Sequence, residues 1–122
     1  MLTSENSKTV LNFYPFYEDL IVNHNKFTTL RLGDRQNEFK IGDLVSITIG
    51  WDATKVDQLR KIEKATITSV KVKRINDLTR QDLEGESPDC QEKSAVKYVL
   101  GSIYRRVVKD DDNVTVIKWR YI

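Results

Sequence analysis

One long predicted strand, 64–76, limits the folds open to this chain because its hydrophobic alternation changes phase partway along. Its apolar residues lie first on odd and then on even positions, as Ala65, Ile67, Val70 and Val72. Successive side chains of a strand point to opposite faces, so both pairs reach one face only if an extra residue is inserted between them. The phase change therefore predicts a β-bulge near Thr68–Ser69, which bends the sheet as a small barrel requires.

The length of 122 residues allows one hydrophobic core. A chain of this size buries about two-thirds of its surface on folding. Apolar residues make up 39% and charged residues 31%, as in ordinary globular proteins. We expect the polar residues 1–10 to be frayed and residues 11–122 to form a single domain. We expect no secretory leader and no membrane segment, since no stretch approaches the ~18 apolar residues of a membrane helix.

The segments before the long strand predict one helix and two strands. Apolar residues recur every three or four positions from Phe13, which predicts a helix ending near Asn23–Asn25. The segments Phe27–Leu32 and 44–49 have the composition and alternation of short strands. Residues 50–62 are compatible with an amphipathic turn and equally with a long hairpin connection.

The segments after the long strand predict two helices and a last strand. Residues 78–83 predict a short helix capped by Thr79, and Ser87 with Pro88 predicts the start of a second helix. Residues 114–122 are apolar on both faces, as in a central strand. The order of elements predicts an α+β fold, a small curved mixed β-barrel with flanking helices and non-sequential strand pairing.

The charge and the scarce metal ligands narrow the classes of function. A net charge of +2 is too small for a general electrostatic grip on nucleic acid, so any such role needs a local patch or pocket. Cys90 is the only cysteine, which excludes an intrachain disulfide and fits a cytoplasmic location. His24 is the only histidine, so we expect no metal site and no cofactor.

Two segments contain residues that could carry chemistry. A lysine that is partly desolvated where the helix meets the strand, as Lys26 would be, can serve as a base. A threonine within its reach, Thr28 or Thr29, would then be an activated nucleophile. The acidic stretch 84–86 could supply a general acid or a partner for a cation. On spacing alone, the favoured interpretation of both segments is that they are ordinary strand and loop residues.

A third candidate is a set of basic residues that could follow a phosphate backbone. Lys71 and Lys73 share one face of the long predicted strand, and the other members lie near them in sequence or after the last helix. As the solvated outer face of a sheet, the set needs no functional explanation. Its members are Lys71, Lys73, Arg74, Arg105 and Arg106.

Together, these segments resemble the ASCH domain, a family of the PUA-like superfamily of small β-barrels. The stretch Lys26–Arg31 is similar to the family's Gly-x-Lys-x-x-Thr-x-Arg signature, with His24 in the place of the glycine. Four more segments follow in the family's order, and the resemblance covers nearly the whole chain. They are Phe39–Val45, Ala65–Val70, Leu78–Glu86 and Val116–Trp119.

The resemblance extends to a bacterial branch of short chains that hydrolyse 4-acetylcytidine to cytidine and acetate. By position, the lysine, threonine and glutamate of that branch fall on Lys26, Thr29 and Glu86. The lysine is thought to activate the threonine, which attacks the acetyl carbonyl, while the glutamate handles protons. We expect Arg31 to pair with a carboxylate or phosphate beside the pocket, and we take Arg31 and Thr28 as substrate-binding residues.

The resemblance implies a cytoplasmic amidohydrolase that acts on an acetylated nucleoside with no metal or cofactor. The alternative is a non-catalytic, or RNA-cleaving, RNA-binding domain that uses the basic residues as phosphate contacts. The partner is therefore a small modified nucleoside or RNA, and not a membrane. The oligomeric state is not encoded in any recognisable pattern.

Overall fold

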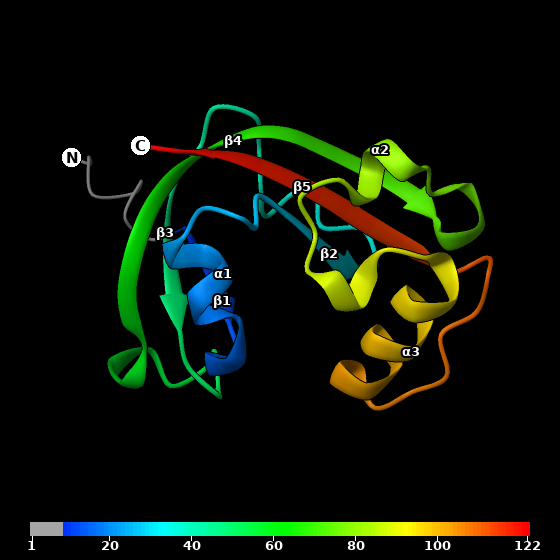
Figure 1. Cartoon of the computed structure of the whole chain (residues 1–122), viewed down its shortest axis with the longest axis horizontal. Coiled ribbons are helices and arrows are strands. Elements are labelled where there is room, and N and C mark those ends of the chain that lie inside the picture. Colours follow the sequence, from blue (N-terminus) through cyan, green and yellow to red (C-terminus); the bar gives the residue numbers. More distant parts are fainter. Residues whose placement is uncertain (1–8) are drawn as a thin grey trace.

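The computed structural model describes residues 9–122, and its longest element is the bent strand β4 (Arg60–Arg74). Figure 1 shows β4 arching over the molecule beside β5 (Asn113–Tyr121). The pairing register between the two strands shifts between Ile67 and Ser69. The bulge predicted near Thr68–Ser69 is thus confirmed, and it lies where the sheet curves.

The sheet has five strands in the order β1-β3-β4-β5-β2. The remaining strands are β1 (Val10–Phe13), β3 (Leu44–Ile49) and β2 (Thr28–Leu32). Strand β1 is parallel to β3, and every other pairing is antiparallel. The predicted α+β fold with non-sequential pairing is confirmed. Because β1 and β2 are both edge strands, the barrel is a half-barrel that stays open between them.

The predicted final strand is central, as expected, because β5 pairs with β4 on one side and β2 on the other. Its buried residues contribute to two separate hydrophobic clusters beneath the curved sheet. The first cluster lies under β1 and β3 and includes Phe13, Tyr17, Ile47 and Trp119. The second lies under β2 and the last helix and includes Leu30, Leu83, Val96 and Leu100.

The first helix begins later than predicted, and a strand precedes it. The 3₁₀ helix η2 (Pro15–Tyr17) leads into α1 (Glu18–Val22), whereas Phe13 ends β1. Tyr14 is extended, with φ −65° and ψ 151°, as residues before proline usually are. The prediction that the helix begins at Phe13 was wrong. The four residues of β1 that lie before Pro15 are too few for their hydrophobic pattern to distinguish a strand from a helix. Residues 1–8 of the segment predicted to be frayed lie outside the described residues.

The connection 50–59 joins β3 to β4 as a long hairpin loop and contains the 3₁₀ helix η3 (Val56–Gln58). Strand β4 begins at Arg60, earlier than predicted, and the 3₁₀ helix η4 (Ile75–Asp77) follows it directly.

Short helices cover the other end of the sheet. The helix α2 (Arg80–Leu83) is capped by Thr79 as predicted. Pro88 starts only the 3₁₀ helix η5 (Pro88–Cys90), and α3 (Lys93–Tyr104) begins after it with Glu92 as the N-cap. The predicted cap by Ser87 was wrong, since its side chain makes no capping hydrogen bond. No helix within residues 9–122 is long and apolar enough to cross a membrane.

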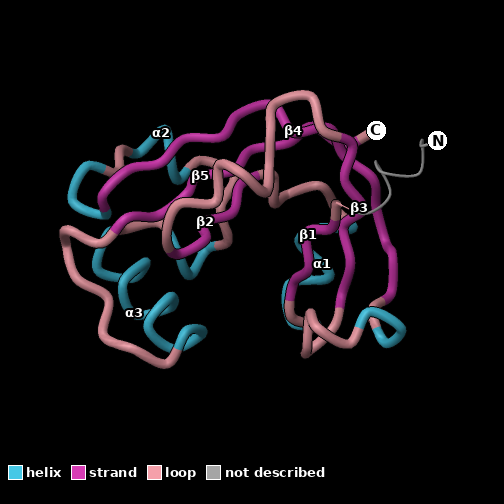
Figure 2. Tube along the Cα trace, turned by 180° about the vertical axis from the view of Figure 1, so that it is seen from behind, coloured by secondary structure: helices cyan, strands magenta, loops and turns pink. Residues whose placement is uncertain are grey.

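Figures 1 and 2 show α1 and α3 on opposite sides beneath the curved sheet, with β2 between them. The open edge between β1 and β2 therefore leaves space between two separately packed halves. Four candidate residues of the sequence analysis line this space: Lys26, Thr29, Arg31 and Glu86.

The capping box of α2 gives a direct test of this part of the fold. The Thr79 hydroxyl accepts the Asp82 N–H at 3.2 Å, and the Asp82 carboxylate accepts the Thr79 N–H at 2.8 Å. We expect Thr79→Ala to lower the free energy of unfolding by ~1 kcal/mol, because it removes the hydroxyl that accepts the Asp82 N–H. Thr79→Ser keeps the hydroxyl and should remain close to the parent in urea unfolding. An equal loss in both variants would contradict this role of the cap.

Candidate active site

A cavity of about 310 Å³ opens between the two halves of the molecule. Among its polar residues, Thr29 and Arg31 lie on strand β2, Lys26 lies just before β2, and Glu86 lies on the loop before η5. Its walls are mainly aromatic and aliphatic, from β1 and η2 on one side and α3 on the other. A concave apolar site with a few converging polar groups is typical of small-molecule binding.

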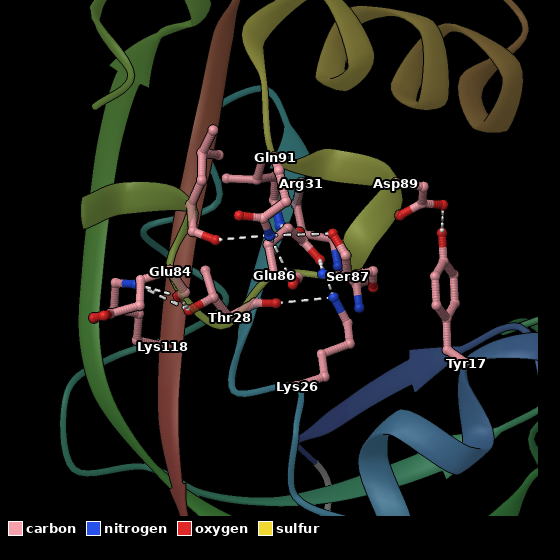
Figure 3. Close-up of polar contacts among 12 residues, drawn as sticks. Tyr17, Lys26, Thr28, Arg31, Glu84, Glu86, Ser87, Asp89, Gln91 and Lys118 are labelled. Atoms are coloured by element: carbon pink, nitrogen blue, oxygen red, sulfur yellow. Dashed lines mark hydrogen bonds and ion pairs between the residues drawn. The ribbon is translucent and has the colours of Figure 1, made fainter. Parts of the chain in front are cut away.

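The most unusual feature of the cavity is a buried ion pair between Lys26 and Glu86. Lys26 is 2% exposed and Glu86 is 9% exposed. The ammonium of Lys26 donates to Glu86 Oε1 and, at 2.9 Å, to the backbone carbonyl of Thr28 (Figure 3). Removing two charges from water costs several kcal/mol per ion, so such a pair needs further hydrogen bonds to be tolerated.

Two backbone amides supply those bonds to the carboxylate. Glu86 Oε2 accepts the N–H of Leu30 at 3.1 Å, and Oε1 accepts the N–H of Ser87 at 2.7 Å. One donor comes from β2 and the other from the loop that carries Glu86. The carboxylate is therefore fixed in both position and rotation relative to the strand that carries Thr29 and Arg31.

The loop that carries Glu86 is attached to the start of β2 through Gly85. The carbonyl of Gly85 accepts the N–H groups of Phe27 at 2.9 Å and Thr28 at 3.1 Å. Gly85 has φ +84°, and a Cβ atom there would lie 2.4 Å from the Phe27 ring. Glycine is therefore required both by the backbone conformation and by the close approach of the ring.

Thr28 strengthens the same attachment and does not line the cavity. Its hydroxyl donates to the carbonyl of Glu84 at 2.6 Å and accepts from Lys118 Nζ at 2.9 Å (Figure 3). Burial lowers the pKa of Lys118 from its ordinary value. Predicted to bind substrate, Thr28 instead has the contacts of a residue that positions the loop.

Thr29 and Arg31 point to the other face of β2 and line the cavity. Thr29 is buried, and its hydroxyl is not bonded to Lys26, whose two acceptors are Glu86 and Thr28. Arg31 donates from Nη2 to the carbonyl of Asn12 on β1 at 3.0 Å. Its side chain thus spans the opening between the two edge strands.

Aromatic rings surround the lysine and extend to the rim. The Lys26 ammonium lies 5.3 Å from the ring centroid of Phe13 and 5.4 Å from that of Tyr17. Trp51, on the connection 50–59, is 69% exposed and lies at the cavity, with its ring 5.6 Å from that of Tyr14. Sequence reasoning could not assign Trp51 to pocket or core. The only available signal was a lone tryptophan in a segment with no clear periodicity.

Tyr17 also links the two halves across the cavity. Its hydroxyl donates to Asp89 Oδ2 at 3.2 Å, joining η2 to η5 (Figure 3). Burial, followed by the charge of Asp89, raises the pKa of Tyr17 above its ordinary value. Tyr17 therefore stays a neutral hydrogen-bond donor at physiological pH.

His24 stands where the family signature has glycine. It has φ +60°, in the left-handed region where glycine is the usual residue. Its ring stacks on Tyr121 with centroids 4.0 Å apart, and its Nε2 lies 3.3 Å from Glu63 Oε2. These contacts help to hold a strained backbone conformation that leads directly into Lys26.

The predicted RNA-contacting residues lie outside the cavity. Lys71 and Lys73 are on β4, whereas Arg105 and Arg106 follow α3. Three of the five are engaged in ion pairs within the chain: Lys73 with Asp82, Arg74 with Asp77 and Arg106 with Asp112. Burial alone would raise the pKa of Asp82, but the bonds from Lys73 and Thr79 outweigh it and the net shift is downward.

Cys90 lines the cavity but is not suited to be a nucleophile. Its side chain is buried, and burial, together with the negative charge of Glu86, raises the pKa of the thiol. The thiolate is the reactive form, so a raised pKa keeps the residue inert. Within residues 9–122, no group of three or more potential ligands is arranged to hold a metal ion.

Comparison with solved structures identifies the fold. An ASCH domain from Lactobacillus crispatus JV V101 superposes with a TM-score of 0.67 at 15% identity, covering 97% of this chain and 82% of that one. A DUF984 protein from Enterococcus faecalis V583 gives a TM-score of 0.59 at 17% identity, covering 85% of this chain and 65% of that one. Neither the models of known protein families nor the curated proteins give a match. The expected ASCH-like, PUA-like fold is thus confirmed.

The Gly85 contact provides a test of how the site is positioned. Gly33 has a similar φ of +87° but open space around it, so Gly33→Ala should cost only the ~1–2 kcal/mol of left-handed backbone strain. Gly85→Ala adds a clash with Phe27 and should cost ~1–3 kcal/mol more. Denaturant unfolding of the two variants measures the difference. Equal destabilisation would show that the ring moves aside freely.

The raised pKa of Cys90 predicts slow thiol chemistry. We expect iodoacetamide at pH 8 to modify the native protein far more slowly than the urea-unfolded protein, because burial disfavours the thiolate and blocks access. The raised folded-state pKa also means that the thiolate stabilises the unfolded state as pH rises above about 8.5. Replacement by serine should flatten part of the loss of stability seen above that pH. Equal alkylation rates in the two states would contradict the burial argument.

Proposed function

We propose that the cavity is the active site of an amidohydrolase that removes the acetyl group from 4-acetylcytidine or a related modified nucleoside. The observation that carries the proposal is the buried pair of Lys26 and Glu86 in one cavity with Thr29. Apolar residues would fill this position at lower cost if the role were only structural. Ion pairs that are desolvated and lie in a cavity are characteristic of functional sites.

Thr29 would be the nucleophile and Lys26 its base. Transfer of a proton from the Lys26 ammonium to Glu86 leaves a neutral amine, which can then accept the proton of the Thr29 hydroxyl. The threonine oxygen attacks the acetyl carbonyl carbon, and a tetrahedral intermediate forms. The bond from that carbon to N4 breaks as Lys26 returns the proton to nitrogen, and cytidine leaves.

Water completes the cycle by hydrolysing the acetyl-threonine ester. The neutral Lys26 takes a proton from the attacking water and passes it to the Thr29 oxygen as the bond between that oxygen and the acetyl carbon breaks. Acetic acid leaves and ionises to acetate, and Glu86, protonated in the first step, returns its proton to Lys26. One water is consumed, and one cytidine and one acetate are formed. Thr28 contributes indirectly, since its bonds to Glu84 and Lys118 keep the loop of Glu86 against β2.

The cavity walls favour a flat heteroaromatic substrate. Phe13, Tyr14, Tyr17 and Trp51 present ring faces and edges around the reacting groups. Unstacked nucleobases bind proteins chiefly through stacking on such side chains. Trp51 is mostly exposed at the rim, where a bound base would cover it.

The RNA-binding alternative receives less support. Its candidate contacts are divided between β4 and the end of α3, and Lys73, Arg74 and Arg106 already have carboxylate partners. A contact set of this kind gives affinity that falls steeply with salt. Salt-sensitive RNA binding without turnover, lost in Lys71→Ala, would favour this alternative over hydrolysis.

Turnover of 4-acetylcytidine, followed by chromatography of released cytidine, tests the proposal. Thr29→Val removes an unbonded hydroxyl with little change in shape, so the variant should fold normally and lose about a thousandfold or more in kcat/KM. Thr29→Ser keeps a hydroxyl and should retain measurable activity. Glu86→Gln should also lose turnover because the amide cannot take the proton from Lys26.

Thr66→Val is the matched control, since Thr66 lies half-buried on β4, away from the cavity. It should hydrolyse the substrate at the parent rate. Full activity in Thr29→Val would exclude Thr29 as the nucleophile. Absence of turnover in the parent would reject the proposed reaction and leave the ASCH-like fold unaffected.

A further inference from the structure

Arg31 is a cavity cation with no counter-charge in the described part of the chain. The eight ion pairs within residues 9–122 do not include it, whereas Lys26 in the same cavity is paired with Glu86. The sequence analysis expected Arg31 to pair with a carboxylate or a phosphate. Since no carboxylate of residues 9–122 forms an ion pair with Arg31, a bound ligand is the candidate for its anionic partner.

The guanidinium is held in place but most of its donors remain available. Of its five N–H groups, one at Nη2 bonds to the carbonyl of Asn12. The flat face lies 5.1 Å from the ring centroid of Phe13, which restricts its orientation. Burial lowers the pKa of Arg31, because removing the charged guanidinium from water costs free energy. A bound anion would reduce that cost. A fixed guanidinium fork matches the geometry of phosphate oxygens.

The other charged groups of the cavity do not remove this preference. Lys26 and Glu86 together are neutral, which leaves the net positive charge of the interior with Arg31. Asp52 also lines the cavity, but it lies on the exposed connection and accepts hydrogen bonds from Thr54. Solvent at the rim therefore screens the Asp52 charge from the interior.

We infer that Arg31 forms an anion subsite that binds the 5′-phosphate of the substrate, so that the preferred substrate is an acetylated cytidine nucleotide and not the neutral nucleoside. The inference rests on the proposed function for the identity of the base. It adds a second recognition point, on the same strand and in the same cavity as Thr29.

The spacing of the two points fits the two ends of a nucleotide. Thr29 and Arg31 lie two residues apart on one face of β2, roughly 7 Å along the strand. The Arg31 side chain extends across the opening and donates to the carbonyl of Asn12 on β1. In a cytidine nucleotide, the exocyclic N4 and the 5′-phosphate lie at opposite ends. An acetyl group at Thr29 therefore leaves the phosphate on the side of Arg31.

Binding measurements that require no turnover test this inference. Isothermal titration of the parent protein should give cytidine 5′-monophosphate an affinity about 10- to 100-fold higher than that of cytidine. Inorganic phosphate should compete with the nucleotide, whereas acetate, the other anion of the reaction, should compete much more weakly. Arg31→Gln keeps an amide donor for Asn12 and should lower nucleotide affinity to that of cytidine, with cytidine binding unchanged.

Arg35→Gln is the matched control, because Arg35 pairs with Glu38 outside the cavity. It should preserve the preference of the parent for the nucleotide. Equal affinities for cytidine and its monophosphate, no binding of either, or competition by acetate alone would overturn the inference. The affinities of the parent protein for cytidine and for its monophosphate test the inference even if Arg31→Gln does not fold.

These binding measurements, taken together with the turnover assay for 4-acetylcytidine, separate the anion subsite from the proposed reaction. Hydrolysis of 4-acetylcytidine without any preference for the monophosphate would reject the anion subsite and keep the proposed reaction. Preference for the monophosphate through Arg31, without hydrolysis of acetylated substrates, would keep the subsite and reject the reaction.

Discussion

The ion pair between Lys26 and Glu86 lies where the two hydrophobic clusters meet, and the site is organised around it. The Lys26 ammonium lies over the rings of Phe13 and Tyr17 of the first cluster. The glutamate is carried by a loop between Leu83 and Cys90 of the second cluster. Each cluster alone would leave one buried charge without a partner, at a cost of several kcal/mol. Correct approach of the two halves is therefore coupled to assembly of the proposed catalytic groups.

The open sheet explains why side chains, and not strand pairing, complete the enclosure. Strands β1 and β2 do not pair, and the gap between them is bridged by Arg31 and Asn12. On the far side, Tyr17 and Asp89 form a second link between the halves. A closed barrel would satisfy these backbone groups within the sheet but would fill its interior with side chains. The half-barrel keeps a concave surface on which a ligand can lie.

Local patterns in the sequence predicted the features that depend on few neighbours. The phase change around Thr68 is a property of one strand, and the cap at Thr79 is formed within four residues, so both were readable. Strand β1 could not be predicted in this way, because it pairs with the distant β3 and its four residues come shortly before a proline. For the site, the Lys26–Arg31 segment was informative only through its resemblance to a known family. The contribution of Trp51 could not be predicted, since nothing in the sequence fixes the path of the connection 50–59.

The connection 50–59 leaves and rejoins the sheet at two strands that are already paired, β3 and β4. Its ends are thus fixed by hydrogen bonds that do not depend on its length or composition. It nevertheless brings Trp51 and Asp52 to the cavity, while the proposed reacting groups lie on β2, just before it and on the loop of Glu86. In the proposed reaction, recognition and chemistry are consequently separable: a different hairpin loop could redirect this scaffold to another ligand while its charged centre stays in place.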